Sequence, residues 1–228
     1  GTLTQGANST LNIAAASVTP TLDALSNTPN TVNFNRANTQ TVKSTTYDNL
    51  TLSAGNTKTL AGAATVNSTL TIAASTTLAD GGFTLTAQAG VVNGGTHSGV
   101  GKISLTGGSG SHSLTGTGAY GNLELNDVNG ASIASGTSTV NGTLTLTSGA
   151  LSSDGGALTM GNSAAISRAA GSLSSLTPTF GTSVNVTYND VNATTTGAEI
   201  PVSTTVLNNL TNNNAAGVIL NVNATLKG

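Results

Sequence analysis

Few side chains in this sequence are of types that do chemistry. The 228 residues contain no cysteine, two histidines (His97 and His112) and eight carboxylates. Without cysteine, disulfides and thiolate metal sites are excluded. Both histidines lie in stretches rich in Gly and Ser, where we expect solvated side chains, and a metal site needs more converging ligands than these. The sequence therefore predicts no metal site and no other cofactor.

The carboxylates are poorly arranged for catalysis. Glycosidases need a pair of them within about 5–10 Å, whereas Asp80 and Asp154 occupy equivalent positions of a sequence repeat and should lie several turns apart. Serine is abundant, but no Gly-x-Ser-x-Gly motif stands at a strand-to-helix turn. No Asp-rich loop of the calcium-binding kind is present. We predict that the chain is not an enzyme.

Two kinds of binding surface remain as alternatives. Tyr47 and Tyr120 occupy equivalent positions of the sequence repeat, and Tyr188 lies close to the corresponding position of its own repeat. The sequence favours tyrosines that pack at corners with the hydroxyl in water over a platform for surface glycans. Thr-x-Thr pairs such as Thr69-x-Thr71 and Thr143-x-Thr145 suggest an ice-binding face, but they recur once or twice per repeat and not on every turn. A carbohydrate- or ice-binding module is therefore the alternative function.

Charge and hydropathy exclude other partners. Charged residues make up 6% of the chain, and the net charge is −2. The six basic residues are scattered, so they form no phosphate-binding patch and predict no nucleic-acid partner. No apolar run approaches the roughly 18 residues that span a bilayer. We expect no membrane insertion.

The apolar residues suit many short strands. Aromatic residues are 3% of the chain, so large side chains cannot fill a thick core. Single Leu, Val and Ile residues alternate with Thr, Asn and Ser, which is the period of a strand with one buried face. Abundant β-branched residues and low net charge favour an ordered all-β protein over a disordered chain.

Internal repeats organise the sequence. Val66–Ile72 (VNSTLTI) returns as Val140–Leu146 (VNGTLTL) and begins again at Val222. Longer repeats of about 76 residues follow from these matches. One covers residues 30–100 and the next 101–181. The third is split into 182–228 plus 1–29, so that the sequence closes on itself.

A finer period predicts the fold. Pairs of the type Leu-x-Leu end at Leu52, Ile72, Leu105, Leu125, Leu146, Val186 and Leu226. Their spacing is about 20 residues, one coil of a β-solenoid. We therefore predict a right-handed parallel β-helix formed by residues 1–228 as a single unit. The stretches 17–30 and 90–101 are expected to leave the coil path as loops. Three tandem immunoglobulin-like sandwiches are the competing fold, but sandwiches need a buried aromatic residue or a disulfide to fill their core.

The motifs resemble those of a known family. Val140–Gly149 (VNGTLTLTSG) and Gly217–Leu226 (GVILNVNATL) are similar to the repeats of very large secreted bacterial surface proteins, the filamentous-haemagglutinin-like adhesins. The resemblance covers most of the chain outside residues 17–30. It implies a structural role at the cell surface, as part of an extracellular filament or adhesin stalk. A subunit of an S-layer-like sheet is a further alternative.

The two ends predict contact between copies of the chain. Gly1, Thr2, Leu3 and Thr4 begin in mid-pattern, and Thr225, Leu226, Lys227 and Gly228 stop in mid-pattern. Open solenoid ends recruit other chains because their backbone groups are unpaired. We expect the last coil of one copy to meet the first coil of the next, by covalent tandem repetition or by head-to-tail stacking, with Leu226 and Leu3 on one inward-facing stack.

Overall fold

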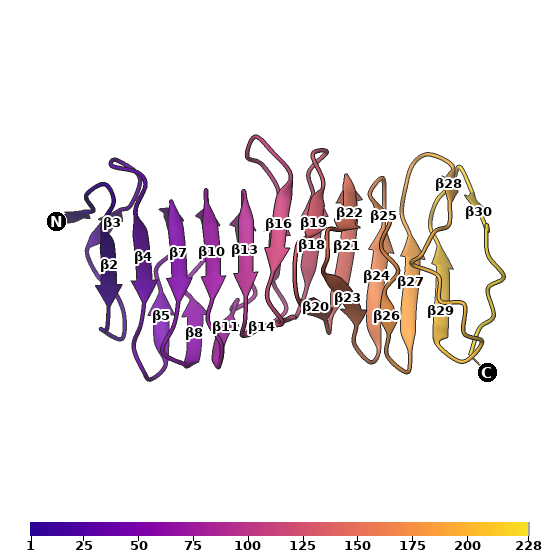
Figure 1. Cartoon of the computed structure of the whole chain (residues 1–228), viewed down its shortest axis with the longest axis horizontal. Coiled ribbons are helices and arrows are strands. Elements are labelled where there is room, and N and C mark those ends of the chain that lie inside the picture. The colour runs from indigo at the N-terminus through magenta and orange to yellow at the C-terminus, as the bar shows by residue number, and fades with distance from the viewer. Residues whose placement is uncertain (228) are drawn as a thin grey trace.

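The chain forms an elongated rod of stacked coils, seen here in a computed structural model that describes residues 1–227 (Figure 1). All regular structure in these residues is β-strand, and every pairing is parallel. Partner strands on neighbouring turns lie about 20 residues apart, and the rod has about eleven turns. The predicted β-solenoid is confirmed, and the sandwich alternative is wrong. At the strand spacing of a sheet, eleven turns give a rod about 50–55 Å long.

Three long sheets run along the rod, and each turn supplies one strand to each sheet. The first, sheet B, has nine strands. They are β2 (Thr10–Ile13), β4 (Thr31–Phe34), β7 (Asn49–Leu52), β10 (Thr69–Ile72), β13 (Gly90–Asn93), β16 (His112–Thr115), β19 (Ala131–Ile133), β22 (Ala150–Ser153) and β25 (Ser172–Ser174).

The second, sheet D, has eight strands. They are β5 (Gln40–Val42), β8 (Asn56–Leu60), β11 (Thr76–Ala79), β14 (Thr96–Ser98), β17 (Ala119–Tyr120), β20 (Thr137–Val140), β23 (Ala157–Met160) and β26 (Thr179–Phe180).

The third, sheet C, has nine strands. They are β6 (Thr46–Tyr47), β9 (Ala64–Val66), β12 (Thr84–Ala87), β15 (Lys102–Leu105), β18 (Leu123–Asn126), β21 (Thr143–Ser148), β24 (Ala164–Arg168), β27 (Val184–Tyr188) and β29 (Leu207–Asn212).

Shorter pairs complete the two ends of the rod. Strand β1 (Thr2–Thr4) pairs with β3 (Thr21–Asp23) at the N-terminal pole. Strand β28 (Thr194–Thr195) pairs with β30 (Val218–Ile219) at the C-terminal pole. Figure 1 shows the two termini at opposite ends of the rod.

The core consists of aliphatic columns that run from turn to turn. In sheet B, Leu50 lies opposite Leu70 on the next turn, and both are completely buried. In sheet C the same holds for Leu105, Leu125 and Leu146. Alternate residues of each strand point inward, so each strand adds two or three small side chains to a thin core. This is why a chain with 3% aromatic residues can fill its interior.

The prediction that residues 17–30 and 90–101 leave the coil path as loops is wrong for the parts of both stretches that form strands. Strands β13 and β14 lie within residues 90–101, so this stretch remains in the stack. Its glycines permit close approach of the backbone: a Cβ on Gly95 would lie 2.2 Å from the Thr76 carbonyl oxygen. The middle of residues 17–30 also lies in the stack, as β3. An exposed excursion instead follows β15, at residues 107–111.

The apparent slip in the 20-residue period has a structural cause. The Leu-x-Leu pairs ending at Leu52 and Ile72 are in sheet B, whereas those ending at Leu105, Leu125 and Leu146 are in sheet C. The pattern moves from one face to the next and does not leave the coil.

The long sequence repeat shows the same displacement. Its matched segments are β7 and β18, or β10 and β21, which lie on sheets B and C respectively. Each pair is separated by eleven strands (18 − 7 and 21 − 10), which is three turns of three strands plus two more strands. The first two copies of the motif therefore lie on different faces of the rod, whereas the third, at residues 207–211, lies in β29 on sheet C like the second.

Candidate functional sites

The residues predicted to contact another copy lie at the two poles. At the N-terminal pole all of β1 is exposed, with Leu3 39% accessible. At the C-terminal pole Thr225, Leu226 and Lys227 are exposed, and the accessible fraction of Leu226 is 55%. Gly228 lies outside the described residues. The equivalent apolar positions on inner turns, such as Leu125 and Leu146, are fully buried.

The strand expected to end at Leu226 does not form. Residues 220–227 contain no strand, and Leu226 is not turned inward. This segment is held beside β29 by the Lys227 amide, which donates to the Leu207 carbonyl oxygen over 2.6 Å. A solenoid strand is normally paired on both sides, and β29 has a neighbouring strand on one side only. The contact of Leu226 with Leu3 of a following copy remains a prediction.

Other apolar residues are exposed in the last ten described residues. Ile219 and Leu220 are 61% and 52% accessible. Ile219 belongs to β30, and Leu220 follows it directly. The C-terminal pole thus exposes three apolar side chains, those of Ile219, Leu220 and Leu226.

The histidines are not solvated as expected. His97 is buried, with its Nε2 3.0 Å from the Asp80 carboxylate, and His112 is buried with its Nε2 3.1 Å from Asp127. They come from β14 and β16, where the alternation of the strand turns them inward. Within residues 1–227, no three His, Asp or Glu side chains come together in a way that could hold a metal ion.

Asp80 is already bonded from three directions. Its Oδ1 accepts the amides of Gly82 and Gly101 at 2.7 and 2.9 Å, and its Oδ2 contacts His97. Burial lowers the pKa of His97, and the nearby Asp80 carboxylate opposes this only in part. The His97 Nδ1 is buried without a partner, which suits a neutral ring. The pair therefore fastens one corner of the rod to the next turn.

The tyrosines are also more deeply buried than expected. Tyr47, Tyr120 and Tyr188 are at most 1% accessible, so none offers a platform for sugars. The Tyr47 hydroxyl donates to the Lys43 carbonyl oxygen over 2.5 Å, and the Tyr188 hydroxyl donates to Glu199 over 2.8 Å. The expectation of hydroxyls in water is wrong, because the side chains point into the columns of the core.

Glu199 anchors the loop between β28 and β29. Its Oε1 accepts hydrogen bonds from Tyr188, from the Gly197 amide and from the Arg168 guanidinium. The Arg168 side chain is 13% accessible and the Glu199 side chain is fully buried. Sequence reasoning missed this ion pair, because the partners are 31 positions apart and belong to no repeated motif.

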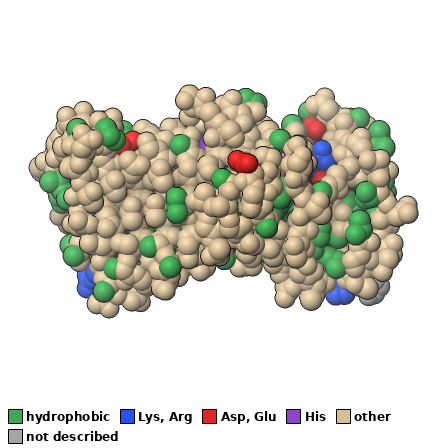
Figure 2. All heavy atoms as spheres, in the orientation of Figure 1, with side chains coloured by type: hydrophobic (Ala, Val, Ile, Leu, Met, Phe, Trp, Pro, Cys, Tyr) green, Lys and Arg blue, Asp and Glu red, His purple; other side chains and the backbone are tan. Residues whose placement is uncertain are grey.

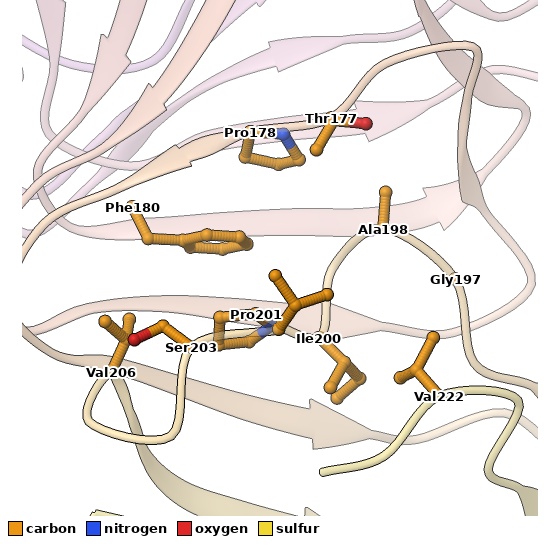
Figure 3. Close-up of a pocket in the computed structure, with 11 residues that line it drawn as sticks. Thr177, Pro178, Phe180, Gly197, Ala198, Ile200, Pro201, Ser203, Val206 and Val222 are labelled. Carbon is orange, nitrogen blue, oxygen red and sulfur yellow. The ribbon is translucent and has the colours of Figure 1, made fainter. Parts of the chain in front are cut away.

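An apolar pocket of substantial size lies under this loop. Its volume is about 390 Å³, and Figure 3 shows the Phe180 ring between Pro178 on one side and Ile200 and Pro201 on the other. Val206 and Val222 close other parts of the wall. None of the described residues that line it is charged, so the pocket is suited to an uncharged apolar group.

The outer face of sheet D has an unusually uniform composition. Apart from Asn56, where β8 begins, and Phe180 in the pocket, every strand residue of this sheet that is not buried is Thr, Ser or Ala. These residues are Thr41, Thr57, Thr59, Thr77, Ala79, Thr96, Ser98, Ala119, Thr137, Thr139, Ala157, Thr159 and Thr179. We call this set the hydroxyl face.

Threonine recurs on the hydroxyl face from turn to turn. One column of directly paired residues contains Thr57, Thr77, Thr96, Ala119, Thr139, Thr159 and Thr179. Six of these seven positions are Thr. The Thr-x-Thr pairs themselves occur on two strands of this sheet, β8 and β20, so the column consists mainly of single threonines. Sequence reasoning missed the column because only the register identifies the residues that line up.

The surface as a whole is sparsely charged. Figure 2 shows one side of the rod on which Lys, Arg, Asp and Glu are few and scattered among uncharged side chains. Lys102 and Glu124 form an ion pair of 2.6 Å on sheet C. Among the described residues, no helix is long and apolar enough to cross a membrane.

Comparisons with family models, with curated proteins and with solved structures find no match to this chain.

Proposed function

We propose that this chain is a structural building block of an extracellular filament or adhesin stalk. In this assembly the coils of one copy stack on, or continue into, the coils of the next. The observation that carries the proposal is the geometry of the rod. All turns advance in one direction, and the first and last turns lie at opposite poles.

The exposed apolar residues at the poles support an end-to-end contact. Leu3 at one pole, and Ile219, Leu220 and Leu226 at the other, are of the residue types that are buried on inner turns. Stacking a further coil would bury them and pair the open strand edges. Because the two poles differ, such a contact is head-to-tail and does not close, so it extends into a filament.

We further propose that the chain has no catalytic activity. The two His–Asp pairs are buried and occupied by structural hydrogen bonds. Glu199 and Arg168 are likewise engaged with each other. An extracellular location is supported by the resemblance to filamentous-haemagglutinin-like adhesins, in which such rods form stalks.

Electron microscopy of a covalent tandem of two copies tests the proposal. We expect one continuous rod of about 100–110 Å, twice the length of a single chain at the strand spacing of a sheet. Two separate rods joined by a flexible kink would contradict it, as would side-by-side sheets of the kind that an S-layer subunit forms.

Charge substitutions at the poles test the contact between separate copies. Leu226→Lys or Leu3→Lys should shorten the axial assemblies seen by electron microscopy and light scattering at high protein concentration. Val128→Lys is the matched control, because Val128 is 85% accessible but lies on a side loop in the middle of the chain. Equal effects of all three substitutions would argue against a contact between the poles of neighbouring copies.

A further inference from the structure

We propose that the hydroxyl face of sheet D binds the surface of ice. This function goes beyond the structural role proposed above and does not depend on contact between the poles. The partner is an ordered lattice of water molecules. The protein groups that would bind it are the threonine hydroxyls and methyls, which the pairing register of the strands aligns from turn to turn.

The first argument is the regular spacing of the face. Neighbouring strands of a sheet are about 4.8 Å apart, and alternate residues along a strand about 6.6 Å apart. No bulge or register shift interrupts sheet D between any two neighbouring strands, whereas sheet C has two. Threonine therefore repeats at a constant interval along one column of the face, and on β8 and β20 a second outward threonine lies two residues away on the same strand.

The second argument is that the hydroxyls are free. Among the described residues, none of the threonine hydroxyls on this face makes a hydrogen bond to the protein. On sheet B some outward polar residues are Asn, and these bond from turn to turn: the Asn33 amide donates to Asn12, and the Ser53 hydroxyl donates to Asn33. Each threonine hydroxyl of the hydroxyl face can therefore both donate to and accept from a water lattice.

The third argument concerns the other possible partners. The cores of protein interfaces are enriched in aromatic residues, Met and Arg, and depleted in Ser and Ala. Sugar-binding faces use exposed aromatic rings, but the three tyrosines are buried inside the rod. A face of small, uncharged side chains fits a flat lattice better than it fits either of these partners.

The test measures how the full chain shapes growing ice crystals and inhibits their recrystallisation. The native protein should do both at micromolar concentration. The double variant Thr77→Lys/Thr139→Lys should lose both effects, since two long charged side chains would hold the face away from the lattice.

The matched control is Thr51→Lys/Thr115→Lys on sheet B. Thr51 and Thr115 are outward residues of one column, three turns apart and half-buried like Thr77 and Thr139, so the two double variants match in spacing and differ in the face that they alter. The control should retain ice shaping, and circular dichroism should show both variants folded. Thr77→Val and Thr77→Ser then separate the contributions of the hydroxyl and the methyl.

Three results would overturn the proposal. One is native protein that leaves ice crystals unshaped. Another is equal loss of activity in the sheet B and sheet D variants. The third is light scattering that shows pairing of two rods which Thr77→Lys/Thr139→Lys abolishes, because the face would then serve a second copy of the chain.

Discussion

The interior of this rod contains titratable side chains at positions where aliphatic residues would be expected. His97 is paired with Leu78 on the preceding turn, and Leu78 with Lys58 on the turn before that. The ammonium group of Lys58 is bonded to the carbonyl oxygens of Arg36, Asn38 and Gly55, and its burial lowers its pKa. Such groups are costly to leave unpaired, so each one fixes the turns around it.

His97 should make the stability of the protein depend on pH. Its pKa in the folded state is lowered by burial, whereas an unfolded histidine titrates at about 6.5. Below about pH 6.5 the unfolded chain therefore binds a proton that the folded chain does not, and the free energy of unfolding decreases as pH falls. Urea unfolding at pH 7.5 and 5.5 should show this decrease, and His97→Gln should reduce it. An unchanged pH dependence in the variant would show that another group is responsible.

The Glu199 carboxylate should be far more important for stability than the surface ion pair. Glu199→Ala leaves a mostly buried Arg168 and the Tyr188 hydroxyl without their partner, which should cost about 3–5 kcal/mol. The control is Lys102→Ala, which removes a side chain that is 40% accessible and should cost less than about 1 kcal/mol. Denaturant titration measures both. Similar losses would mean that the loop is held by the rest of its packing and not by Glu199.

At the scale of the strand and its corners, glycine controls how closely successive turns approach. Gly149 joins β21 to β22 with a φ of 77°, and a Cβ there would lie 1.9 Å from the Asp127 carbonyl oxygen. Gly149→Ala should therefore destabilise the fold by about 2 kcal/mol or more, from strain and steric overlap together. Gly6→Ala is the control, because the nearest atom is 4.0 Å away; its effect should stay within about 0.5 kcal/mol. Thermal unfolding of the two variants checks this, and equal melting temperatures would contradict it.

The elements also show how far the sequence could predict the structure. Alternation of apolar and polar residues with a 20-residue period predicts the stacked parallel strands, because that signal is local and repeated. Which face a motif occupies depends on the number of residues in every preceding corner, and small differences in that number accumulate. The Leu-x-Leu pairs therefore could not be assigned to sheets; those ending at Ile72 and Leu105 lie on different ones.

Burial of polar residues was predicted least well. The neighbours of His97 and His112 in sequence are Gly, Ser and Thr, which gives no sign of an apolar surrounding. They are buried because they occupy inward-pointing positions of β14 and β16. Their carboxylate partners are 17 and 15 residues away in the sequence. The hydroxyl face was missed for a related reason, since its threonines are neighbours only after the turns have stacked.

For the whole molecule, contacts between adjacent turns determine how the rod opens. Each turn touches mainly the turns before and after it, so stability approximates a sum of neighbour interactions. The turns at the poles have one neighbour and should open first. Hydrogen exchange followed by mass spectrometry should show slow exchange for the strands within residues 112–146 and fast exchange for residues 2–4 and 218–226. Uniform protection along the chain would instead indicate all-or-none unfolding.

The displacement of the long repeat from one face to the next has a consequence for how such a chain can change in evolution. Recombination between the two copies at Asn49-Leu50 and Asn122-Leu123 would delete residues 50–122, which removes three turns and two strands. The junction could still stack, because β18 turns Leu123 and Leu125 inward just as β7 turns Leu50 and Leu52 inward. Everything after the junction would, however, be rotated by two-thirds of a circumference relative to what precedes it, so the two halves of the hydroxyl face would no longer align. Loss of the segment between these two copies would therefore change length and surface together, because it shortens the rod and reorients all the outward side chains beyond the junction.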